Sequence, residues 1–149
     1  MSNTLPTIGN QCKLVWMSAG SWASPTWTVV EVAKDVQTNV TRAEVVCAYR
    51  GVDEEFTRSG QKKFEISCKL AHLPTNAAYE AIRDALLNGT SIVVAALTAG
   101  SAVVGAEGPK MKAEVFSHNR GEALNSPVEI DLVFKPNGEE TTVWLEVAA

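Results

Sequence analysis

Residues 64–70 spell FEISCKL, and this short stretch decides the fold class. Apolar and polar side chains alternate along it without a break: Phe64, Ile66, Cys68 and Leu70 against Glu65, Ser67 and Lys69. Successive side chains of a strand point to opposite faces of a sheet, so a period of two predicts a strand with one buried and one solvated face. Half-buried strands of this kind are typical of antiparallel sheets.

The same alternation returns nearer the C-terminus and predicts two more strands, Lys110–Phe116 and Val128–Lys135. Weaker patterns bring the expected total to roughly seven strands, including Gln11–Met17, Trp27–Lys34, Asp35–Tyr49, Gly60–Leu70 and Thr142–Val147. Within Asp35–Tyr49 the alternation breaks around Arg42 and Ala43, where a β-bulge would restore it. Pro136-Asn137-Gly138 is a hairpin turn signal, and Arg50–Ser59 and Ser117–Pro127 are polar connections.

One helix is predicted between Pro74-Thr75-Asn76, which supplies start signals, and Asn88-Gly89, which supplies a stop. Its apolar residues recur on one face: Ala78, Ile82, Ala85 and Leu86. Ile92–Leu97 follows with no polar side chain, as expected for a strand covered on both faces. We expect the helix to cover one of these faces.

Composition limits the class of protein. The chain has 149 residues, of which 46% are hydrophobic, and this suits one folded domain. We expect a loose arm over residues 1–10 and a single mainly β domain over residues 11–149, an antiparallel β-sandwich or barrel with one flanking helix. The net charge of −4 argues against tight DNA binding, because such proteins neutralise phosphates with a basic surface.

The first residues, MSNTLPTIGNQCKLVWM, lack the charged start and the apolar run of a signal peptide. The longest apolar stretch, Ile92–Leu97, is far shorter than the about 20 residues that a membrane-spanning helix needs. We therefore expect a protein that is made and kept in a cytoplasm, with no direct membrane binding.

The three cysteines, Cys12, Cys47 and Cys68, form no C-x-x-C pair. Cys68 has the apolar parity of its strand, so we expect a small buried hydrophobic residue. With His72 it offers only two ligands, too few for a zinc site. Whether Cys12 forms a disulfide between subunits is left open.

No catalytic motif is complete. Gly100 and Gly105 have P-loop spacing, but Ala106-Glu107 stands where a phosphate-binding lysine is required. Ser117-His118 has no third group to orient it, and Asp53-Glu54-Glu55 lacks the ligand spacing of a calcium loop. We expect a protein that is not an enzyme and has no catalytic residue, metal site or cofactor.

The order of the segments resembles the tail tube proteins of long-tailed bacteriophages over nearly the whole chain. SPTWTVVEVAKDVQTNVTRAEVVCAYRG (24–51) and GQKKFEISCKL (60–70) look like the first long strand pair of that family. NAAYEAIRDALLNGTSIVVAAL (76–97) is similar to its single helix and the strand after it. AEVFSHNRGEALNSPVEIDLVFKP (113–136) is similar to the closing segment.

The resemblance implies a structural virion protein that forms hexameric rings, stacked into the hollow tail tube through which DNA passes transiently and without specific binding. It implies other tail proteins as partners: the tape measure, the tail terminator and a baseplate or sheath. The protein would be assembled in the host cytoplasm and located in the virion tail. A mildly acidic channel would suit this role, because a basic wall would trap DNA.

Two sets of residues are candidates for this function. The polar positions of the clearest strands are expected to line the channel, with the outer surface as the alternative for each: Glu65, Ser67, Lys69, Glu129 and Asp131. The Gly51–Ser59 loop is expected to reach the next ring, with Phe56 as its apolar anchor: Val52, Asp53, Glu54, Glu55 and Phe56.

Two other functions remain open. The tube of a phage-like injection or secretion system would share the fold and the ring but carry proteins. An immunoglobulin-like binding module on a virion would instead be a stable monomer with an exposed ligand patch.

Overall fold

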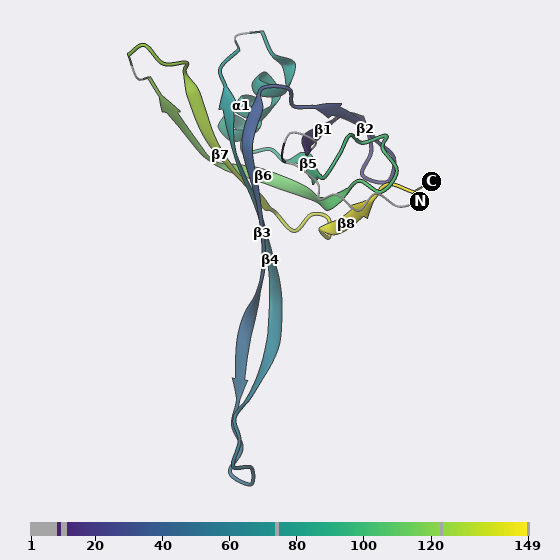
Figure 1. Ribbon diagram of the computed structural model, residues 1–149, viewed down its shortest axis with the longest axis vertical. Helices are drawn as coiled ribbons and strands as arrows, with labels where there is room; N and C mark the ends of the chain where they lie inside the picture. The colour runs from purple at the N-terminus through teal and green to yellow at the C-terminus, as the bar shows by residue number, and fades with distance from the viewer. Residues whose placement is uncertain (1–8, 10–11, 74, 123, 149) are drawn as a thin grey trace.

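The computed structural model describes residues 9, 12–73, 75–122 and 124–148. The described chain is mainly β and contains one helix (Figure 1). Its elements follow in the order β1 (Lys13–Gly20), β2 (Pro25–Val29), β3 (Ala33–Cys47), β4 (Phe56–Ala71), α1 (Ala77–Asn88), β5 (Ile92–Leu97), β6 (Glu107–Gly121), β7 (Glu129–Pro136) and β8 (Val143–Glu146). The expected class, an antiparallel β fold with one flanking helix, is confirmed. The loose N-terminal segment predicted over residues 1–10 lies outside the described residues except for Gly9.

All strand pairs are antiparallel and belong to one eight-stranded sheet in the order β2-β1-β5-β6-β7-β4-β3. The long strand β6 joins the two halves of this sheet. On one side it pairs with β5, and on the other side with β8 over residues 107–110 and with β7 over residues 113–121. β7 and β8 therefore lie one after the other along the same side of β6.

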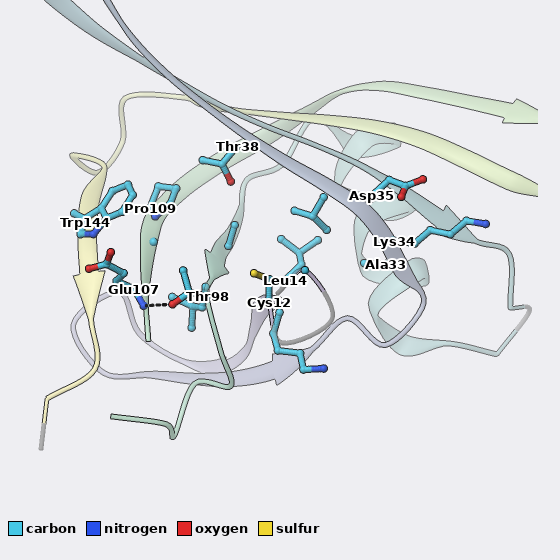
Figure 2. A pocket seen from close by; sticks show the side chains of 16 residues that line it. Cys12, Leu14, Ala33, Lys34, Asp35, Thr38, Thr98, Glu107, Pro109 and Trp144 are labelled. Atoms are coloured by element: carbon cyan, nitrogen blue, oxygen red, sulfur yellow. Dashed lines mark hydrogen bonds between the residues drawn. The ribbon is translucent and has the colours of Figure 1, made fainter. Parts of the chain in front are cut away.

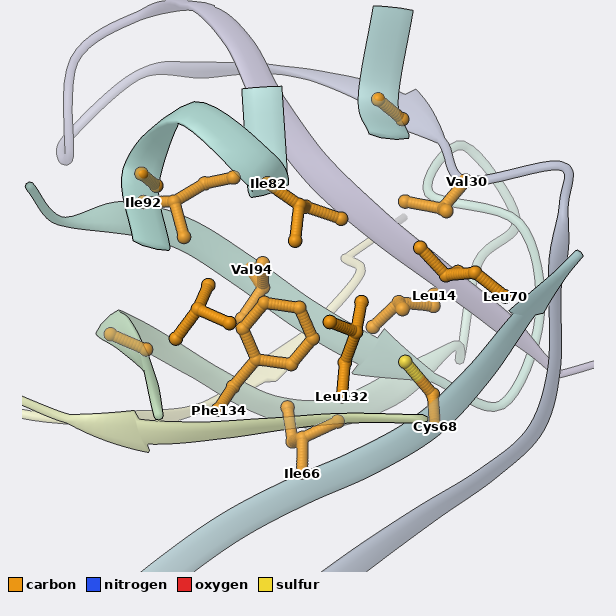
Figure 3. Packing of buried hydrophobic residues seen from close by; sticks show 14 of the residues in the cluster. Leu14, Val30, Ile66, Cys68, Leu70, Ile82, Ile92, Val94, Leu132 and Phe134 are labelled. Carbon is orange, nitrogen blue, oxygen red and sulfur yellow. The ribbon is translucent and has the colours of Figure 1, made fainter. Parts of the chain in front are cut away.

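The main core lies between α1 and one face of the sheet (Figure 3). Ile66, Cys68 and Leu70 of β4 point into it, and all three are nearly inaccessible to solvent. They meet Leu132 and Phe134 of β7 from the neighbouring strand. The strand predicted from residues 64–70, its two faces and the burial of Cys68 are thus confirmed.

Helix α1 begins and ends where its sequence signals predict. The side chain of Asn76 accepts a hydrogen bond from the backbone N–H of Tyr79 at 3.1 Å, which satisfies one of the free amides of the first turn. Gly89 closes the helix with a φ of 66°, a left-handed conformation that glycine adopts without strain. Ala78, Ile82 and Ala85 are buried against the sheet.

Strand β5 is covered on both faces, as its unbroken apolar sequence predicts. Ile92 and Val94 belong to the main core under α1. On the opposite face, Ala95 and Leu97 join Val15 of β1 in a second, small cluster. Trp27 and Leu145 pack against this cluster from β2 and β8.

β3 and β4 form a hairpin that extends far beyond the body of the protein (Figure 1). We call its projecting part, residues 40–63, the arm. Its pairing continues to Cys47 opposite Phe56. The register shifts between Arg42 and Glu44, so the predicted bulge at Ala43 is confirmed.

Several local expectations were wrong. The predicted strand Trp27–Lys34 is interrupted, because β2 ends at Val29, the chain turns at residues 31–32 and β3 begins at Ala33. Ser117–Pro127 is not a connection throughout, because β6 continues to Gly121; a register shift after Val115 hides the alternation. Pro136-Asn137-Gly138 makes a turn, but β8 then pairs with β6 rather than with β7, so no hairpin forms. Phe56–Ser59 lies in strand β4, so the polar connection is shorter than expected.

Candidate functional site

The face of the sheet opposite α1 remains open to solvent over β3, β4, β7 and the C-terminal half of β6. We call this surface the polar face. Because paired residues of adjacent strands point to the same side, the registers define its members. They are Lys34, Gln37, Asn39, Thr41, Lys63, Glu65, Ser67, Lys69, Glu114, Ser117, Asn119, Glu129, Asp131, Val133 and Lys135.

The structure brings the five candidate channel residues together on this face. Glu65, Ser67 and Lys69 follow one another along β4, and Lys69 lies directly opposite Asp131 of β7. Glu129 lies two residues before Asp131 and points to the same side of β7. Their location on one surface follows from the registers, whereas their role as channel lining remains a prediction.

An ion pair crosses the polar face from β3 to β7. The ammonium group of Lys34 donates a hydrogen bond to the carboxylate of Glu129, and strand β4 lies between their two strands. This hydrogen bond raises the pKa of Lys34 and lowers the pKa of Glu129, because each charge stabilises the other. Both groups are therefore held in their charged forms near neutral pH.

The charges of the polar face cancel. Four lysines stand against four acids: Lys34, Lys63, Lys69 and Lys135 against Glu65, Glu114, Glu129 and Asp131. The formal net charge of −4 of the whole chain therefore comes from other surfaces. The five channel candidates alone are mildly acidic, with Glu65, Glu129 and Asp131 against Lys69, and the acidity of a channel wall remains a prediction.

Sequence reasoning missed Lys34, which contributes one end of the ion pair. Its strand loses the alternation immediately afterwards, because Asp35 takes a left-handed φ of 52° and the register shifts before Gln37. The break in the pattern next to Lys34-Asp35 was the available signal. A bulge at that point returns Gln37 and Asn39 to the same face as Lys34.

The four strands that carry the polar face have a free edge on each side. β3 ends the sheet and pairs only with β4. At the other side, the pairing of β5 with β6 ends at Ala113, so residues 114–121 of β6 have no partner strand there among the described residues. Free edges expose unpaired backbone N–H and C=O groups, which can pair with another chain.

The arm carries large apolar side chains that are exposed in the single chain. They include Val40, Val45, Val46, Tyr49, Val52 and Phe56. Val52–Glu55 lie in the turn at its tip, while Phe56 is the first residue of β4 and is 44% exposed. A two-stranded ribbon is at best marginally stable alone in water, so this arm requires a further contact to be firmly ordered.

A largely apolar pocket of about 460 Å³ opens between β3 and the strands β1, β6 and β8 (Figure 2). Leu14, Thr38, Pro109 and Trp144 lie around it. In the described part of the chain, no group of three or more His, Cys, Asp or Glu side chains gathers to hold a metal ion.

Among the described residues, no helix is both long enough and apolar enough to cross a membrane.

Comparison with known proteins places this geometry in one fold. No family model and no curated protein matches the sequence. Among solved structures, the SPP1 tail tube aligns over 97% of this chain and 81% of its own, with a TM-score of 0.75 and 14% identity. The tail of a gene transfer agent particle, determined with C6 symmetry, covers 96% of this chain and all of its own at a TM-score of 0.71 and 10% identity.

The sheath–tube complex of an extracellular contractile injection system also matches. It aligns over 97% of this chain and 94% of its own, with a TM-score of 0.67 and 10% identity. The described chain therefore has the tail tube fold.

Proposed function

We propose that this chain is a structural tube subunit that assembles into hexameric rings, which stack into a hollow tail tube for the passage of DNA. The observation that carries the proposal is the open, polar, four-stranded part of the sheet with a free edge on each side. The tail tube fold supports it, and one matching tail has C6 symmetry.

The two free edges are different, and this favours a ring. If β3 of one copy pairs with residues 114–121 of β6 in the next copy, the contact is head-to-tail. A head-to-tail contact that closes by rotation produces a ring in which each copy makes both contacts. The sheet then continues from copy to copy as a barrel, and both free edges of its four-stranded part are paired.

The polar face supplies the inner wall of this ring. α1 covers the opposite face of the same strands, so it would lie outside the channel. Glu65, Ser67, Lys69, Glu129 and Asp131 would line the channel together with the other residues of the polar face. Their polar side chains remain hydrated, as a water-filled passage requires.

The arm would make the contact between successive rings. Its tip carries Val52, Asp53, Glu54 and Glu55, followed by Phe56 at the start of β4. Burying the exposed ring of Phe56 in an adjacent ring would be favourable by the hydrophobic effect. It would also supply the extra contact that an isolated hairpin lacks.

The partners in this proposal are the tape measure, the tail terminator and a baseplate or sheath. The protein would be assembled in the host cytoplasm, would reside in the virion tail and would have no catalytic role. A second candidate is the tube of a contractile injection system, favoured by the likeness to the tube of the sheath–tube complex. Assembly is common to both candidates, and only the cargo differs.

The test is to image the concentrated, purified protein by negative-stain electron microscopy and to measure hydrogen exchange before and after assembly. We expect stacked rings of six copies. Assembly should protect backbone amides in β3 and in residues 114–121 of β6, while the free edge of β2 stays exchangeable. A stable monomer under all assembly conditions, as an immunoglobulin-like module would give, would refute the proposal.

Two variants test the proposed contact between successive rings. Replacing residues 43–61 by an Asn-Gly turn joins Arg42 to Lys62, which already face each other in the hairpin, so the body should fold. We expect this variant and Phe56→Ala to form single rings but few tubes. The control is Leu87→Ala, because Leu87 is 74% exposed on α1 and far from the arm. Unchanged tube yield in both arm variants would rule out the stacking role.

A further inference from the structure

Acids are interspersed with the lysines along the polar face. Lys34 is paired with Glu129, and Lys69 lies opposite Asp131 in the register of β4 and β7. The positive charge of Lys69 also lowers the pKa of Glu129. Glu129 and Asp131 of β7 are thus the acids nearest in register to these two lysines.

The two remaining lysines also have acids at neighbouring positions of the face. Lys135 of β7 lies opposite Glu114 of β6, and its ammonium group sits 5.6 Å from the centre of the Phe116 ring. Lys63 lies at the base of the arm, two residues from Glu65 on the same side of β4. At the border of the face, Lys112 forms an ion pair of 2.7 Å with Glu139.

This arrangement affects how the face meets a polyanion. A lysine binds a DNA phosphate by displacing condensed counterions, and this release supplies most of non-specific affinity. A lysine that already has a carboxylate beside it gains less from a phosphate, because the exchange breaks one ion pair to form another and adds repulsion from the acid. Unpaired lysines on the same strands would form a basic, DNA-binding wall.

We propose that the polar face is a charge-compensated surface for duplex DNA, in which Glu129 and Asp131 keep Lys34 and Lys69 from binding the phosphate backbone. The inference rests on the proposed function, because it assumes that this face meets DNA. The lysines in turn prevent the acids from giving the face a net negative charge. Without them, the negative faces of several copies around one channel would repel one another.

The test uses the double variant Glu129→Gln and Asp131→Asn, which removes two charges and preserves side-chain size. Binding of a fluorescent duplex of about 30 base pairs is measured by anisotropy with the protomer and by co-sedimentation with assembled tubes. We expect no retention by the wild type at about 50 mM salt, and at least about a tenfold gain in affinity for the variant. The gain should decrease steeply with salt, with a log–log slope of about −0.9 for each phosphate contacted.

Two controls separate the face from a simple change in net charge. Asp84→Asn plus Glu80→Gln removes two acids from α1, on the other side of the sheet, and should leave DNA binding unchanged. Adding Lys34→Gln and Lys69→Gln to the double variant should abolish the new binding. Equal gains in the face variant and the helix variant, or no gain in the face variant, would overturn the proposal.

These failures differ from a failure of the proposed function. If wild-type protein forms tubes but the face variant does not bind DNA, the tube assignment remains and charge compensation is wrong. If no rings form, the tube assignment fails whatever the DNA measurement gives.

Discussion

Lys34 and Glu129, which are 95 positions apart in the chain, are joined by a hydrogen-bonded ion pair across the intervening strand β4. The pair connects the start of the β3–β4 hairpin to the strand that leads back from the β6–β7 hairpin. The pair therefore links the bases of two hairpins that also share the pairing of β4 with β7.

The first prediction concerns pH. The lowered pKa of Glu129 means that its pairing contributes stability above its ordinary value of 4.5 and loses that contribution as pH falls through the lowered value. The raised pKa of Lys34 means that the contribution is complete below 10.5 and is lost as pH rises through the raised value. Glu129→Gln should therefore be slightly less stable than wild type between these limits and equal to it in acid. Urea unfolding at several pH values checks this; a difference that grows in acid would contradict it.

The second prediction concerns thiol reactivity. Burial, with a smaller contribution from the charge of Asp131, raises the pKa of Cys68 to about 12. The Cys68 thiol should therefore resist alkylation in native protein at pH 8, whereas the exposed Cys12 should react at once. Mass spectrometry after brief labelling measures both sites, and the same labelling in denaturant provides the control. Rapid modification of Cys68 without denaturant would show that the α1–sheet core opens readily.

Local sequence signals predicted those elements whose cause is itself local. Asn76 and Gly89 fix both ends of α1 because a cap depends on a few adjacent backbone groups. The bulge at Ala43 was visible because a single extra residue shifts a period-two pattern by one. Ile92–Leu97 was predicted with its observed bounds, since a short apolar run without a polar position is expected of a strand covered on both faces.

Pairing between distant strands could not be predicted in the same way. The turn at Pro136-Asn137-Gly138 is a local property, but the partner of β8 depends on the space left beside residues 107–110 of β6. Gly108 stands in a glycine-rich stretch without alternation, and yet it lies buried within β6. The reason for this glycine is the closeness of β5, which no local pattern reveals.

The candidate site was predictable in part. Parity along β4 and β7 assigned each channel candidate to the solvated face of its own strand, and the register of the two strands brings these faces onto one surface. Their role in a channel stays a prediction. The compensation of charge was not predictable, because Lys34 reaches Glu129 only when β3 lies beside β4. The length of the arm was underestimated because its outer half has no buried face and therefore no clear alternation.

The third prediction compares two phenylalanines. Phe134 is completely buried in the main core, so Phe134→Ala should reduce the free energy of unfolding by about 3–5 kcal/mol. Phe56→Ala removes an equally large ring from the exposed arm and should change the stability of the monomer by no more than about 0.5 kcal/mol. Chemical denaturation of dilute, monomeric protein measures both values. A large loss for Phe56→Ala would mean that its ring packs within its own chain rather than serving assembly.

The fourth prediction concerns the contact between β5 and β6 at Gly108. A Cβ atom placed on Gly108 would lie 1.6 Å from the carbonyl oxygen of Ala96 and 2.7 Å from its carbonyl carbon. Both are backbone atoms of β5, so no side-chain rotation can relieve the overlap. Gly108→Ala should therefore separate the two strands and destabilise the fold by at least about 3 kcal/mol.

The matched control for this contact is Gly51→Ala, because a Cβ atom at Gly51 would meet nothing within 4 Å. Circular dichroism melting of the two variants in parallel measures the difference. Gly108→Ala should have a melting temperature well below that of wild type or fail to fold. Gly51→Ala should have the melting temperature of wild type. Since β6 joins the half of the sheet that carries the polar face to the half that carries β1 and β2, any folded Gly108→Ala protein should also form fewer rings. A Gly108→Ala protein with wild-type melting would show that β5 and β6 lie further apart than described.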